Sequence, residues 1–582
     1  MNQGLILPFL KKHAPWYGVA VISVGMAKAI QVQIPNVIGN FINTFRTGIT
    51  VPVIETYAVK LAAIALGYVL LFGLGQYTVG KYARIFEGDL RSRLFSHWET
   101  LESHYFEQHT VGDLLSHVLN DVPAVRQAMA GGVSQILQAV FLLIATLFMT
   151  ITKVNLELTL VSLVPLVLIP VVVVRLGPKI KKQSRLVQES LSEMSDMAEE
   201  SLQSIRLIKS TANEGIELKR FSERTDRIYD RSMQQVRLNT MFQALIPLLT
   251  GISFAIALVF GGYLTLNHTI TLGAFVAFTV YLSMLVRPLM QFGNVINIFQ
   301  NSSASLARIQ TLLEAVPSIS DPDDPAPVPD RARIRLRNLS FSYPGASAPV
   351  LHNITLTIEP GTTLGVVGRT GSGKSTLCGI LLREIDPPPG TVFIGDTDIR
   401  DLHRQELREH ISYVPQDGFL FSTSIGNNIA FPMDPADAGL DTIASAASKA
   451  HILATIQTMP KEFATVVGER GINLSGGQRQ RVAIARALIK SHANLIIFDD
   501  SLSAVDTLTE SAILDTLAEL RRQGRTMILV SHRLSSLRHA DRIAVLEHGS
   551  VVEYGTPSEL LKQPGLYASL YAIQSEGGAS IG

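Results

Sequence analysis

Nine consecutive residues in the second half of the chain have the types and spacing needed to bind phosphate. They follow the apolar run TLGVVG and are Gly368, Arg369, Thr370, Gly371, Ser372, Gly373, Lys374, Ser375 and Thr376. The first eight match the pattern GxxxxGK followed by Ser or Thr, between a strand and a helix. The glycines let backbone N–H groups line a nest at a helix N-terminus, where the helix dipole favours an anion. Lys374 adds positive charge and Ser375 an oxygen ligand for Mg²⁺, so we predict a nucleotide phosphate site.

A second element ends in two carboxylates. The run LIIFDD, from Leu495 to Asp500, is typical of a buried strand, and its end is where an α/β nucleotide-binding sheet presents groups to a ligand. Asp499 is suited to hold the water shell of Mg²⁺. A strand that ends in Asp is common, and the phosphate loop upstream is what favours a functional role here.

A third motif lies between these two and reads Leu474, Ser475, Gly476, Gly477 and Gln478, followed by RQRVAIARAL. Ser475 and the two glycines can form another nest that clamps a γ-phosphate. With this motif the sequence resembles the ATP-binding cassette (ABC) family, over essentially the whole chain. The resemblance is to the exporter branch and implies a half-transporter that needs a second half. In that family the clamped phosphate belongs to the opposite cassette, so the ATP site closes only in a dimer.

The resemblance assigns further roles to single residues. Tyr343, in FSYPG, matches the aromatic residue that stacks on adenine, and Gln416, in YVPQD, the glutamine that touches Mg²⁺. His532 matches the switch histidine that contacts the γ-phosphate. The metal ligands implied are therefore Ser375, Gln416 and Asp499, and the catalytic set is Asp500, His532, Lys374 and Gln416.

Four segments match parts of the family that connect its subunits. Ser503–Asp506 resembles the loop that crosses the dimer interface, and Gly468–Gly471 resembles the exporter segment that senses the cytoplasmic loops. The stretches around Val111–Asp113 and from Ile208 to Gly215 resemble the two coupling helices.

One position departs from the family. The residue after the Mg²⁺ aspartate is normally Glu, which polarises the attacking water, and here it is Asp500. Its side chain is about 1.5 Å shorter, and a misplacement of roughly 1 Å can cost about a hundredfold in rate. We therefore expect this site to bind ATP and hydrolyse it slowly, while LSGGQ serves a competent site on the partner. This asymmetry resembles heterodimeric bacterial exporters; a homodimer with two slow sites is the alternative.

Six apolar stretches must position this machinery in a membrane. They lie near residues 16–44, 57–80, 132–152, 157–176, 241–264 and 272–300, and each has the length of a transmembrane helix. The connections after the second and fourth stretches are long and rich in Lys and Arg, which marks the cytoplasmic side. Both termini are therefore expected inside. Charged and apolar residues at helical spacing, as in Lys179–Ser210, predict that the spans continue as helices; an ordinary pair of solvated helices is the alternative.

Composition agrees with this division. The 582 residues are 47% hydrophobic and only 17% charged, with a mean hydropathy of +0.26, which indicates a membrane-embedded part. A net charge of +1 gives no field to attract nucleic acid, so no nucleic-acid partner is expected. The single cysteine, Cys378, excludes an intrachain disulfide and a cysteine-based metal cage.

The chain is therefore predicted to be multidomain. Residues 1–320 form an all-α transmembrane domain with six helices, the Pro/Asp-rich residues 321–330 a linker, and residues 331–582 an α/β nucleotide-binding domain. The runs TLGVVG, ISYVPQ, LIIFDD and TMILVSH are its expected parallel strands.

Polar residues inside the spans are candidates for the substrate path. Lys28, with Gln31 one turn on, lies mid-span and lines this path, makes a pair between helices or snorkels toward the membrane surface. Arg287, Gln291, Asn294 and Asn301 fall on one helix face, which we predict lines an inward-open cavity.

The expected function is ATP-driven export of an amphipathic or lipophilic substrate across the inner membrane, with Mg²⁺ and ATP, as one half of a dimer. Asp500 supports an alternative function, a membrane-bound ATP-gated regulator or channel. The intact His532, Gln416 and LSGGQ speak against it, because such a protein would not require them. An importer with the exporter fold, for a siderophore for example, is a further alternative.

Overall fold

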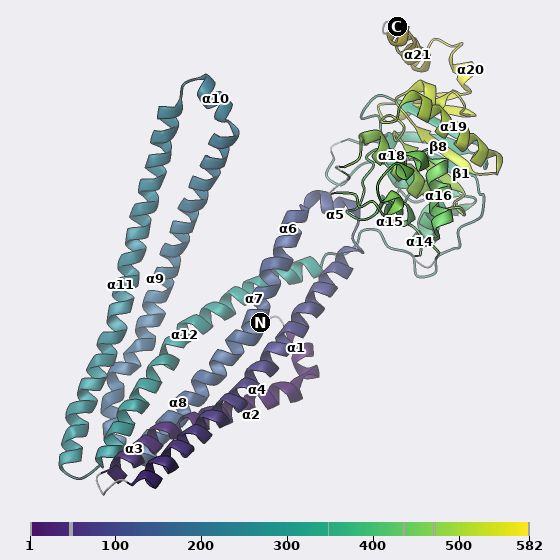
Figure 1. Ribbon diagram of the computed structural model, residues 1–582. Coiled ribbons are helices and arrows are strands. Elements are labelled where there is room, and N and C mark those ends of the chain that lie inside the picture. Colours follow the sequence, from purple (N-terminus) through teal and green to yellow (C-terminus); the bar gives the residue numbers. More distant parts are fainter. Residues whose placement is uncertain are drawn as a thin grey trace. The chain divides into compact units, whose positions relative to one another are not determined.

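The computed structural model describes residues 3–45, 50–346, 348–434, 437–468, 471 and 473–579. The chain divides into two compact units. The helical unit comprises Met1–Thr100 and Phe106–Ala315, and the sheet unit comprises Leu101–Tyr105 and Val316–Gly582. Figure 1 shows long helices in the first unit and strands with short helices in the second.

The helical unit carries six stretches of helix that, among the described residues, are long and apolar enough to cross a membrane. This confirms the six predicted spans. They are formed by α2 (Ala14–Gln31) with α3 (Gln33–Phe45), α4 (Val51–Trp98), α6 (Val111–Ser116) with α7 (Val122–Gln127) and α8 (Val133–Lys153), α9 (Leu156–Gln203), α11 (Glu214–Leu266) and α12 (Leu272–Leu313). The π-helical turns His117–Asp121 and Ala128–Gly132 join α6, α7 and α8, and the short helices are α1 (Gln3–Lys12), α5 (Ser103–Gln108) and α10 (Ile205–Ser210).

The helices extend far beyond the apolar stretches, as the charged periodic segments predict. Helices α9 and α11 are 48 and 53 residues long and lie side by side as a hairpin closed by α10 (Figure 1). Their polar ends are joined by Arg231 of α11, which donates hydrogen bonds to the Leu186 carbonyl (2.9 Å) and the Ser190 hydroxyl (2.6 Å) of α9. The predicted helix from Lys179 breaks once, at Ser204.

The first span bends where the backbone loses a hydrogen bond. Pro35 lacks the N–H that would bond the Gln31 carbonyl, and the helix breaks at Val32. At the break, the Val32 carbonyl accepts a hydrogen bond from the Tyr281 hydroxyl of α12, at 3.0 Å. Further along, α3 and α12 approach so closely that a Cβ at Gly273 would lie 1.9 Å from the Gly39 carbonyl oxygen. This crossing therefore requires glycine.

The sheet unit contains two sheets. Six strands run in the order β10-β9-β3-β8-β7-β6, all parallel except for the β9–β10 pair, and four run in the antiparallel order β2-β1-β4-β5. The strands are β1 (Ile334–Phe341), β2 (Leu351–Ile358), β3 (Thr363–Gly368), β4 (Val392–Ile394), β5 (Thr397–Asp398), β6 (Ile411–Val414), β7 (Leu495–Asp499), β8 (Thr526–Val530), β9 (Arg542–Glu547) and β10 (Ser550–Gly555). The four predicted strands are β3, β6, β7 and β8, which confirms a parallel α/β core.

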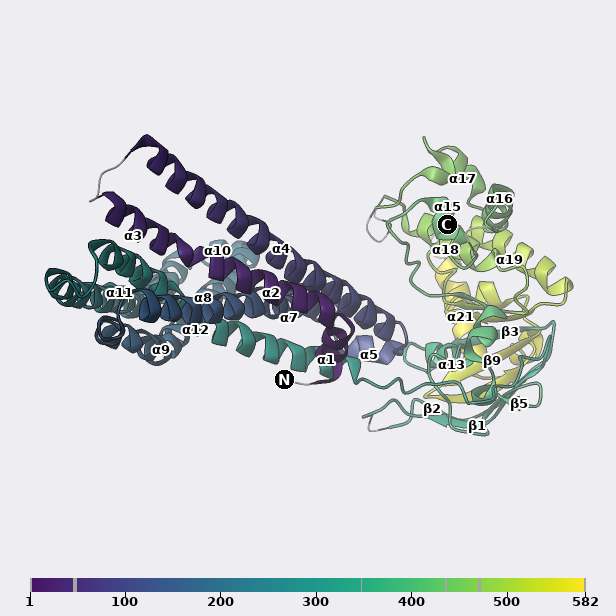
Figure 2. The ribbon, with the colours of Figure 1, turned by 90° about the horizontal axis from the view of Figure 1, so that it is seen from below.

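Short helices cover the parallel sheet. They are α13 (Lys374–Leu381), α14 (Arg404–Glu409), α15 (Ile425–Ala430), α16 (Leu440–Lys449), α17 (Leu453–Gln457), α18 (Gly476–Leu488), α19 (Thr507–Arg522), α20 (Pro557–Leu560) and α21 (Leu566–Ala579). Helix α13 packs on β3 and β7, whereas α18 packs on α15, α16 and β6. In Figure 2, α13 and α18 accordingly lie in different parts of this unit. The phosphate loop before α13 and the LSGGQ motif at the start of α18 therefore lie in separate regions of the sheet unit.

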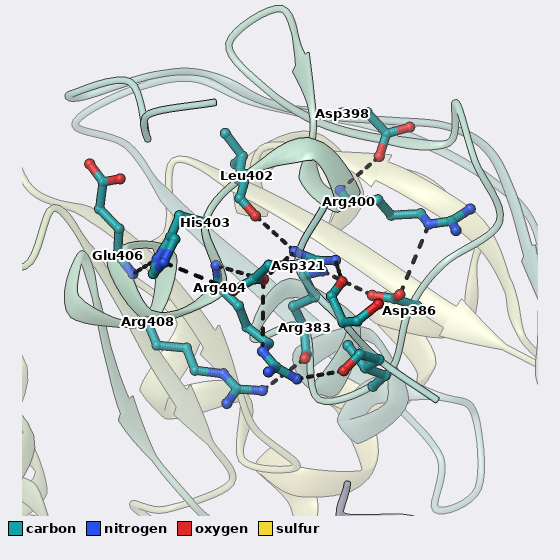
Figure 3. A network of polar contacts seen from close by, with 12 residues as sticks. Asp321, Arg383, Asp386, Asp398, Arg400, Leu402, His403, Arg404, Glu406 and Arg408 are labelled. Carbon is teal, nitrogen blue, oxygen red and sulfur yellow. Dashed lines mark hydrogen bonds and ion pairs between the residues drawn. The ribbon is translucent and has the colours of Figure 1, made fainter. Parts of the chain in front are cut away.

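The predicted linker is held against the sheet unit. Arg383, only 1% exposed, donates to the Ser320 carbonyl (2.8 Å), to the Asp321 carboxylate (3.3 Å) and to Asp386 (3.0 Å), as Figure 3 shows. Arg404 binds the Ile319 carbonyl at 2.8 Å. Further along, Ala326 forms a single β-bridge with Leu402. The Pro/Asp-rich segment thus contributes to the packing of this unit, although it forms neither a helix nor a full strand.

Candidate functional site

The predicted phosphate loop lies between β3 and α13. Gly371 and Gly373 have φ angles of +82° and +96°, values that only glycine adopts without strain. A Cβ at Gly373 would lie 2.5 Å from the Leu351 side chain, and one at Gly368 would lie 2.2 Å from the Leu546 carbonyl oxygen. The loop conformation therefore depends on these glycines, and its backbone opens at the N-terminus of α13 as an anion site requires.

Lys374, the first residue of α13, folds back over this loop. Its ammonium donates to the carbonyls of Gly368 and Arg369, both at 2.9 Å, and lies 3.5 Å from the Ser372 hydroxyl. Burial lowers the pKa of Lys374, and the negative charges of Asp500 and Asp499 oppose this effect. A mostly buried cation is thus placed among the groups that would surround a phosphate, while Arg369 and Thr370 are exposed at the loop tip.

Asp499 ends β7 next to the loop and is only 3% exposed. Its carboxylate accepts hydrogen bonds from Ser375 and, at 3.4 Å, from the Tyr413 hydroxyl. Burial raises the pKa of Asp499 above its ordinary value, the two hydrogen bonds lower it, and the charge of Asp500 raises it further. The structure thus brings together two of the three predicted Mg²⁺ ligands, Ser375 and Asp499, and both supply the oxygen atoms that Mg²⁺ prefers.

Asp500 lies in the left-handed region of the backbone, with φ of +48°. Asp is one of the few residues besides glycine that enter this region, because its short polar side chain can bond locally. Here the carboxylate accepts a hydrogen bond from the His532 backbone N–H (3.2 Å) and lies 3.8 Å from the His532 imidazole. The structure therefore pairs the two predicted catalytic residues at the ends of β7 and β8.

The LSGGQ motif forms the start of α18. The Ser475 hydroxyl accepts from the Gln478 backbone N–H (3.3 Å), and the Gln478 side chain accepts from the Ser475 N–H (3.0 Å). This capping box leaves the N–H groups of Gly476 and Gly477 at an exposed helix end. A Cβ at Gly477 would lie 3.1 Å from the Ala504 carbonyl oxygen, so the loop Ser503–Asp506 packs against the motif.

Two further predicted contacts with nucleotide lie on loops. The Tyr343 hydroxyl is 3.2 Å from the Thr376 hydroxyl of α13, which places the aromatic ring beside the phosphate loop. Gln416 is exposed and lies two residues after the end of β6. Neither side chain is enclosed by the protein, as expected of groups that would contact a bound ligand.

One part of the predicted machinery is separate from the rest. Within the part of the sheet unit that the structure describes, no hydrogen bond joins the phosphate loop to Ser475 or Gln478.

Of the segment Gly468–Gly471, Glu469 and Arg470 lie outside the described residues. Val111–Asp113 begins α6, and Ile208–Gly215 runs from α10 into α11.

Two contributing residues carry no strong signal in the sequence. Tyr413, in β6, bonds Asp499, and burial raises the pKa of its hydroxyl, so it remains a neutral donor. Gln480, only 2% exposed, donates to the Pro415 carbonyl at 3.1 Å and so holds the loop that bears Gln416. Gln480 lies two residues beyond LSGGQ, which is the only sequence signal that could have indicated it.

The polar residues predicted in the spans have partners on neighbouring helices. The Lys28 ammonium donates to Gln31 (3.0 Å) and lies 3.5 Å from the Tyr68 hydroxyl of α4. Asn294 donates to Gln135 of α8 (2.9 Å), and Asn301 accepts from Lys181 of α9 (3.3 Å). Arg287, Asn294 and Asn301 are nevertheless exposed in the chain.

Comparison with known proteins agrees with this arrangement. Residues 17–289 match the family described as the ABC transporter transmembrane region, and residues 351–503 match the family described as ABC transporter. The chain is 33% identical to the probable multidrug resistance ABC transporter ATP-binding/permease protein YheI of Bacillus subtilis, over 98% of each chain. It is 30% identical to the ATP-dependent lipid A-core flippase of Syntrophus aciditrophicus, over 98% of this chain and 94% of the flippase.

A solved structure shows the same fold. A bacterial Atm1-family ABC exporter with ATP bound superposes with a TM-score of 0.77 at 26% identity and covers 97% of this chain and 98% of its own. Together with the phosphate loop, the LSGGQ motif and the six long helices, these matches identify the family. The chain belongs to the ABC transporters, as a multi-pass membrane protein whose ATPase unit couples ATP hydrolysis to transport.

Proposed function

We propose that the chain is one half of a dimeric exporter that moves an amphipathic or lipophilic substrate across the cytoplasmic membrane, with both termini and the nucleotide-binding domain inside. The observation that carries this proposal is that one polypeptide joins a phosphate site to six membrane-spanning helices. The names of the multidrug and lipid A-core relatives agree with a cargo that has a large apolar part. The domain limits proposed are residues 1–320, 321–330 and 331–582.

The residues of the sheet unit fit Mg²⁺ and ATP. The phosphate loop has a glycine cradle that a Cβ would fill, and the Ser375 hydroxyl and Asp499 carboxylate already meet. Tyr343 would stack on adenine, and Ser375, Gln416 and Asp499 would hold Mg²⁺. When bound, this ion neutralises charge on the phosphates. Lys374 would exchange its contacts with the loop carbonyls for contacts with phosphate oxygens.

The proposal of a dimer rests on two partial ATP sites in this chain, the phosphate loop and the LSGGQ motif. Gly476 and Gly477 present N–H groups at an exposed helix end, away from this chain's own phosphate loop. A second cassette would bring its γ-phosphate to this end, and the capping box of Ser475 and Gln478 fixes the helix start that would receive it. Closure of two cassettes on ATP would then be transmitted by the long helices to the membrane part.

Asp500 makes the chain's own site slow in this proposal. Hydrolysis forms a bond from the water oxygen to the γ-phosphorus and breaks the bond to the ADP oxygen, and a base must accept the water proton. The Asp500 carboxylate is 7% exposed and occupied with His532, and it is one methylene shorter than the Glu of the family. We therefore propose a heterodimer in which the partner supplies the fast site.

Transport by proteoliposomes tests the proposal. The chain is purified alone and together with a co-expressed second half-transporter, and uptake of a fluorescent amphiphile into inside-out vesicles is compared with ATP and without ATP. ATP-dependent uptake that is lost in Lys374→Ala is expected. Conductance without uptake would favour the gated channel, and extrusion from the same vesicles would favour the importer.

A further inference from the structure

His532 lies in a link of three residues, Ser531–Arg533, between two regular elements. Strand β8 ends at Val530, and the 3₁₀ turn Leu534–Leu537 begins directly after the link. The first N–H groups of a helical turn have no partner inside the turn, and the side chain of Arg533, at the cap position, does not bond them. The position of His532 therefore depends on partners from other parts of the sheet unit.

Gln574 of α21 supplies two of these partners with one side-chain amide. Its Oε1 accepts a hydrogen bond from the Leu534 N–H at 3.0 Å, and its Nε2 donates to the His532 carbonyl at 2.6 Å. An amide suits this task because it carries a donor and an acceptor at a fixed separation. The two backbone groups lie on either side of Arg533, so Gln574 grips the end of the link at two points.

Helix α21 is itself fixed at its start and along one face. Glu553 of β10 accepts hydrogen bonds from the N–H groups of Leu566 and Tyr567, the first two residues of α21, where a negative charge is favourable. Tyr567 is only 2% exposed, and Leu570 packs against the same core. Gln574 lies seven residues after Tyr567, which is about two helical turns, so both lie on one face. The core thus directs Gln574 toward the link.

The link has two further attachments, and neither replaces that of Gln574. The Asp500 carboxylate accepts a hydrogen bond from the His532 N–H at 3.2 Å. The Arg533 guanidinium donates to the Ser503 carbonyl at 2.7 Å. The carbonyl of His532, however, is held by Gln574. Helix α21 therefore resists rotation of the peptide that joins His532 to Arg533.

The direction of this peptide determines where the His532 imidazole lies. The imidazole is 3.8 Å from the Asp500 carboxylate, and 41% of the His532 side chain is exposed, so the backbone does most to orient it. In the proposed site this imidazole contacts the γ-phosphate, and a misplacement of roughly 1 Å can cost about a hundredfold in rate. Loss of the Gln574 amide should thus slow hydrolysis although Gln574 does not touch ATP.

We infer that Gln574 is a positioning residue for ATP hydrolysis, through which the C-terminal helix α21 holds the backbone of the link and so keeps the His532 imidazole at the γ-phosphate. The inference rests on the proposed role of His532 and adds a residue that lies 42 positions further along the chain. It makes the last helix of the chain a part of the hydrolytic machinery.

Gln574→Met tests the inference, because Met has a similar length and no amide. Two copies of the full chain are placed in each nanodisc, and hydrolysis of radiolabelled ATP is followed over a range of ATP concentrations. The kcat should fall by about tenfold or more, because the imidazole is displaced. The KM should change by less than about twofold, because the phosphate loop is intact. An unchanged kcat would overturn the inference.

Photolabelling with azido-ATP counts the folded chains that bind nucleotide, so each rate is divided by the labelled fraction. Partial unfolding of Gln574→Met then leaves the comparison valid. If the whole fall in rate disappears after this correction, the role of Gln574 is only structural and the inference is wrong. Gln574→Glu is a second variant, which keeps the acceptor for Leu534 and loses the donor to His532. Its kcat should fall too, and a wild-type kcat would contradict the inference.

Ser569→Ala is the matched control on the same helix. The Ser569 hydroxyl is exposed and donates to the Gly565 carbonyl at 2.8 Å, within the region of α21 that does not touch the link. Its loss should leave kcat unchanged. An equal fall in Ser569→Ala and Gln574→Met would mean that the rate responds to α21 in general and that the Gln574 amide has no special role.

Two more variants separate the inference from the proposed function. Lys374→Ala should abolish azido-ATP labelling, and His532→Ala should lower kcat at least as much as Gln574→Met. If His532→Ala is slow and Gln574→Met hydrolyses ATP at the wild-type rate, the inference is wrong and the proposed site stands. If His532→Ala keeps the wild-type rate, the proposed role of His532 is wrong and the inference fails with it.

Discussion

At the scale of single residues, Asp499 and Asp500 are neighbours with different surroundings. Asp499 points to Ser375 and Tyr413, the side of the phosphate loop, whereas Asp500 points to His532. In the proposed site the first would hold a metal, and the second contacts His532. The missing methylene at position 500, compared with Glu, thus changes the reach of the proposed catalytic base and leaves the residues of the phosphate site unchanged.

Asp500→Glu should raise ATP turnover at this chain's own site. The longer side chain restores the reach toward the attacking water, and the gain should approach about a hundredfold if geometry alone limits the rate. Phosphate release by the purified chain, with its partner's phosphate-loop lysine replaced, measures this site by itself. Asp500→Asn serves as the control and should show no gain. An unchanged rate in Asp500→Glu would mean that the site is disabled elsewhere.

Asp499→Asn should stabilise the nucleotide-free protein and weaken its binding of Mg²⁺ with ATP by about tenfold or more. Burial raises the pKa of Asp499 in the folded state, so the ionised carboxylate destabilises the fold at neutral pH. Asn keeps an oxygen for Ser375 and Tyr413 and carries no charge.

The stability gain should depend on pH. It should be full at neutral pH and shrink as pH falls through the raised pKa, because the wild-type carboxyl is then neutral too. Cys378, the single cysteine of the chain, is fully buried in α13, so a thiol-reactive dye reports unfolding. A lower Tm for Asp499→Asn at neutral pH would contradict this account.

At the scale of elements, the segment after α12 depends on one buried cation. Arg383 donates hydrogen bonds to the Ser320 carbonyl, the carboxylates of Asp321 and Asp386, and the Leu402 carbonyl (Figure 3). All these groups belong to the sheet unit. The network therefore fixes the chain where it enters this unit.

Arg383→Met should destabilise the sheet unit by about 3 kcal/mol, because it leaves two carboxylates without their buried partner. Dye labelling of Cys378 during heating measures the loss. The matched control is Arg522→Gln, which breaks the exposed ion pair with Glu519 (2.7 Å) and should change stability by less than about 1 kcal/mol. Equal effects of the two substitutions would show that the Arg383 network stabilises the sheet unit no more than an exposed ion pair does.

The elements differ in how far the sequence predicts them. Strands β3, β7 and β8 are buried along their whole length, so each appears as a continuous apolar run. Strands β1 and β2 alternate buried and exposed residues and include Arg335 and Arg337, and the antiparallel sheet they form was not predicted. Strand β1 pairs with the next strand, β2, and also with β4, which lies far along the chain, and neither pairing is marked by a continuous apolar run.

The candidate site shows the same difference. The phosphate loop and the two aspartates follow from local spacing, since the glycines and the strand end act within a few residues. Arg383 looks like an ordinary surface residue, because its partner Asp321 lies 62 residues earlier. The enclosure of Lys28 by Tyr68, 40 residues away, is equally invisible in sequence.

At the scale of the whole molecule, ATP must bind the closed pair of cassettes better than the separated pair, or it shifts nothing. In the proposed dimer, the phosphate loop and the LSGGQ motif of this chain would belong to different ATP pockets, and this division would provide that difference. A heterodimer divides the work further: the partner's γ-phosphate would meet the LSGGQ of this chain at the fast site.

Loss of LSGGQ function should therefore damage the partner more than this chain. Ser475→Arg, which fills the exposed helix end, should lower the ATPase rate of the heterodimer by about a hundredfold or more if the partner's site supplies most turnover. Binding of ATP to this chain's own phosphate loop should be unchanged. Phosphate release and azido-ATP labelling measure the two effects separately, and a parallel loss of both would argue against the division.

The most direct test counts polypeptides. The chain is placed in nanodiscs that hold one copy, two copies, or one copy with its partner half, and ATP hydrolysis is measured in each. The account predicts negligible hydrolysis with one copy, slow hydrolysis with two and fast hydrolysis with the partner. Full-speed hydrolysis by a single copy would contradict the claim that two chains complete each site.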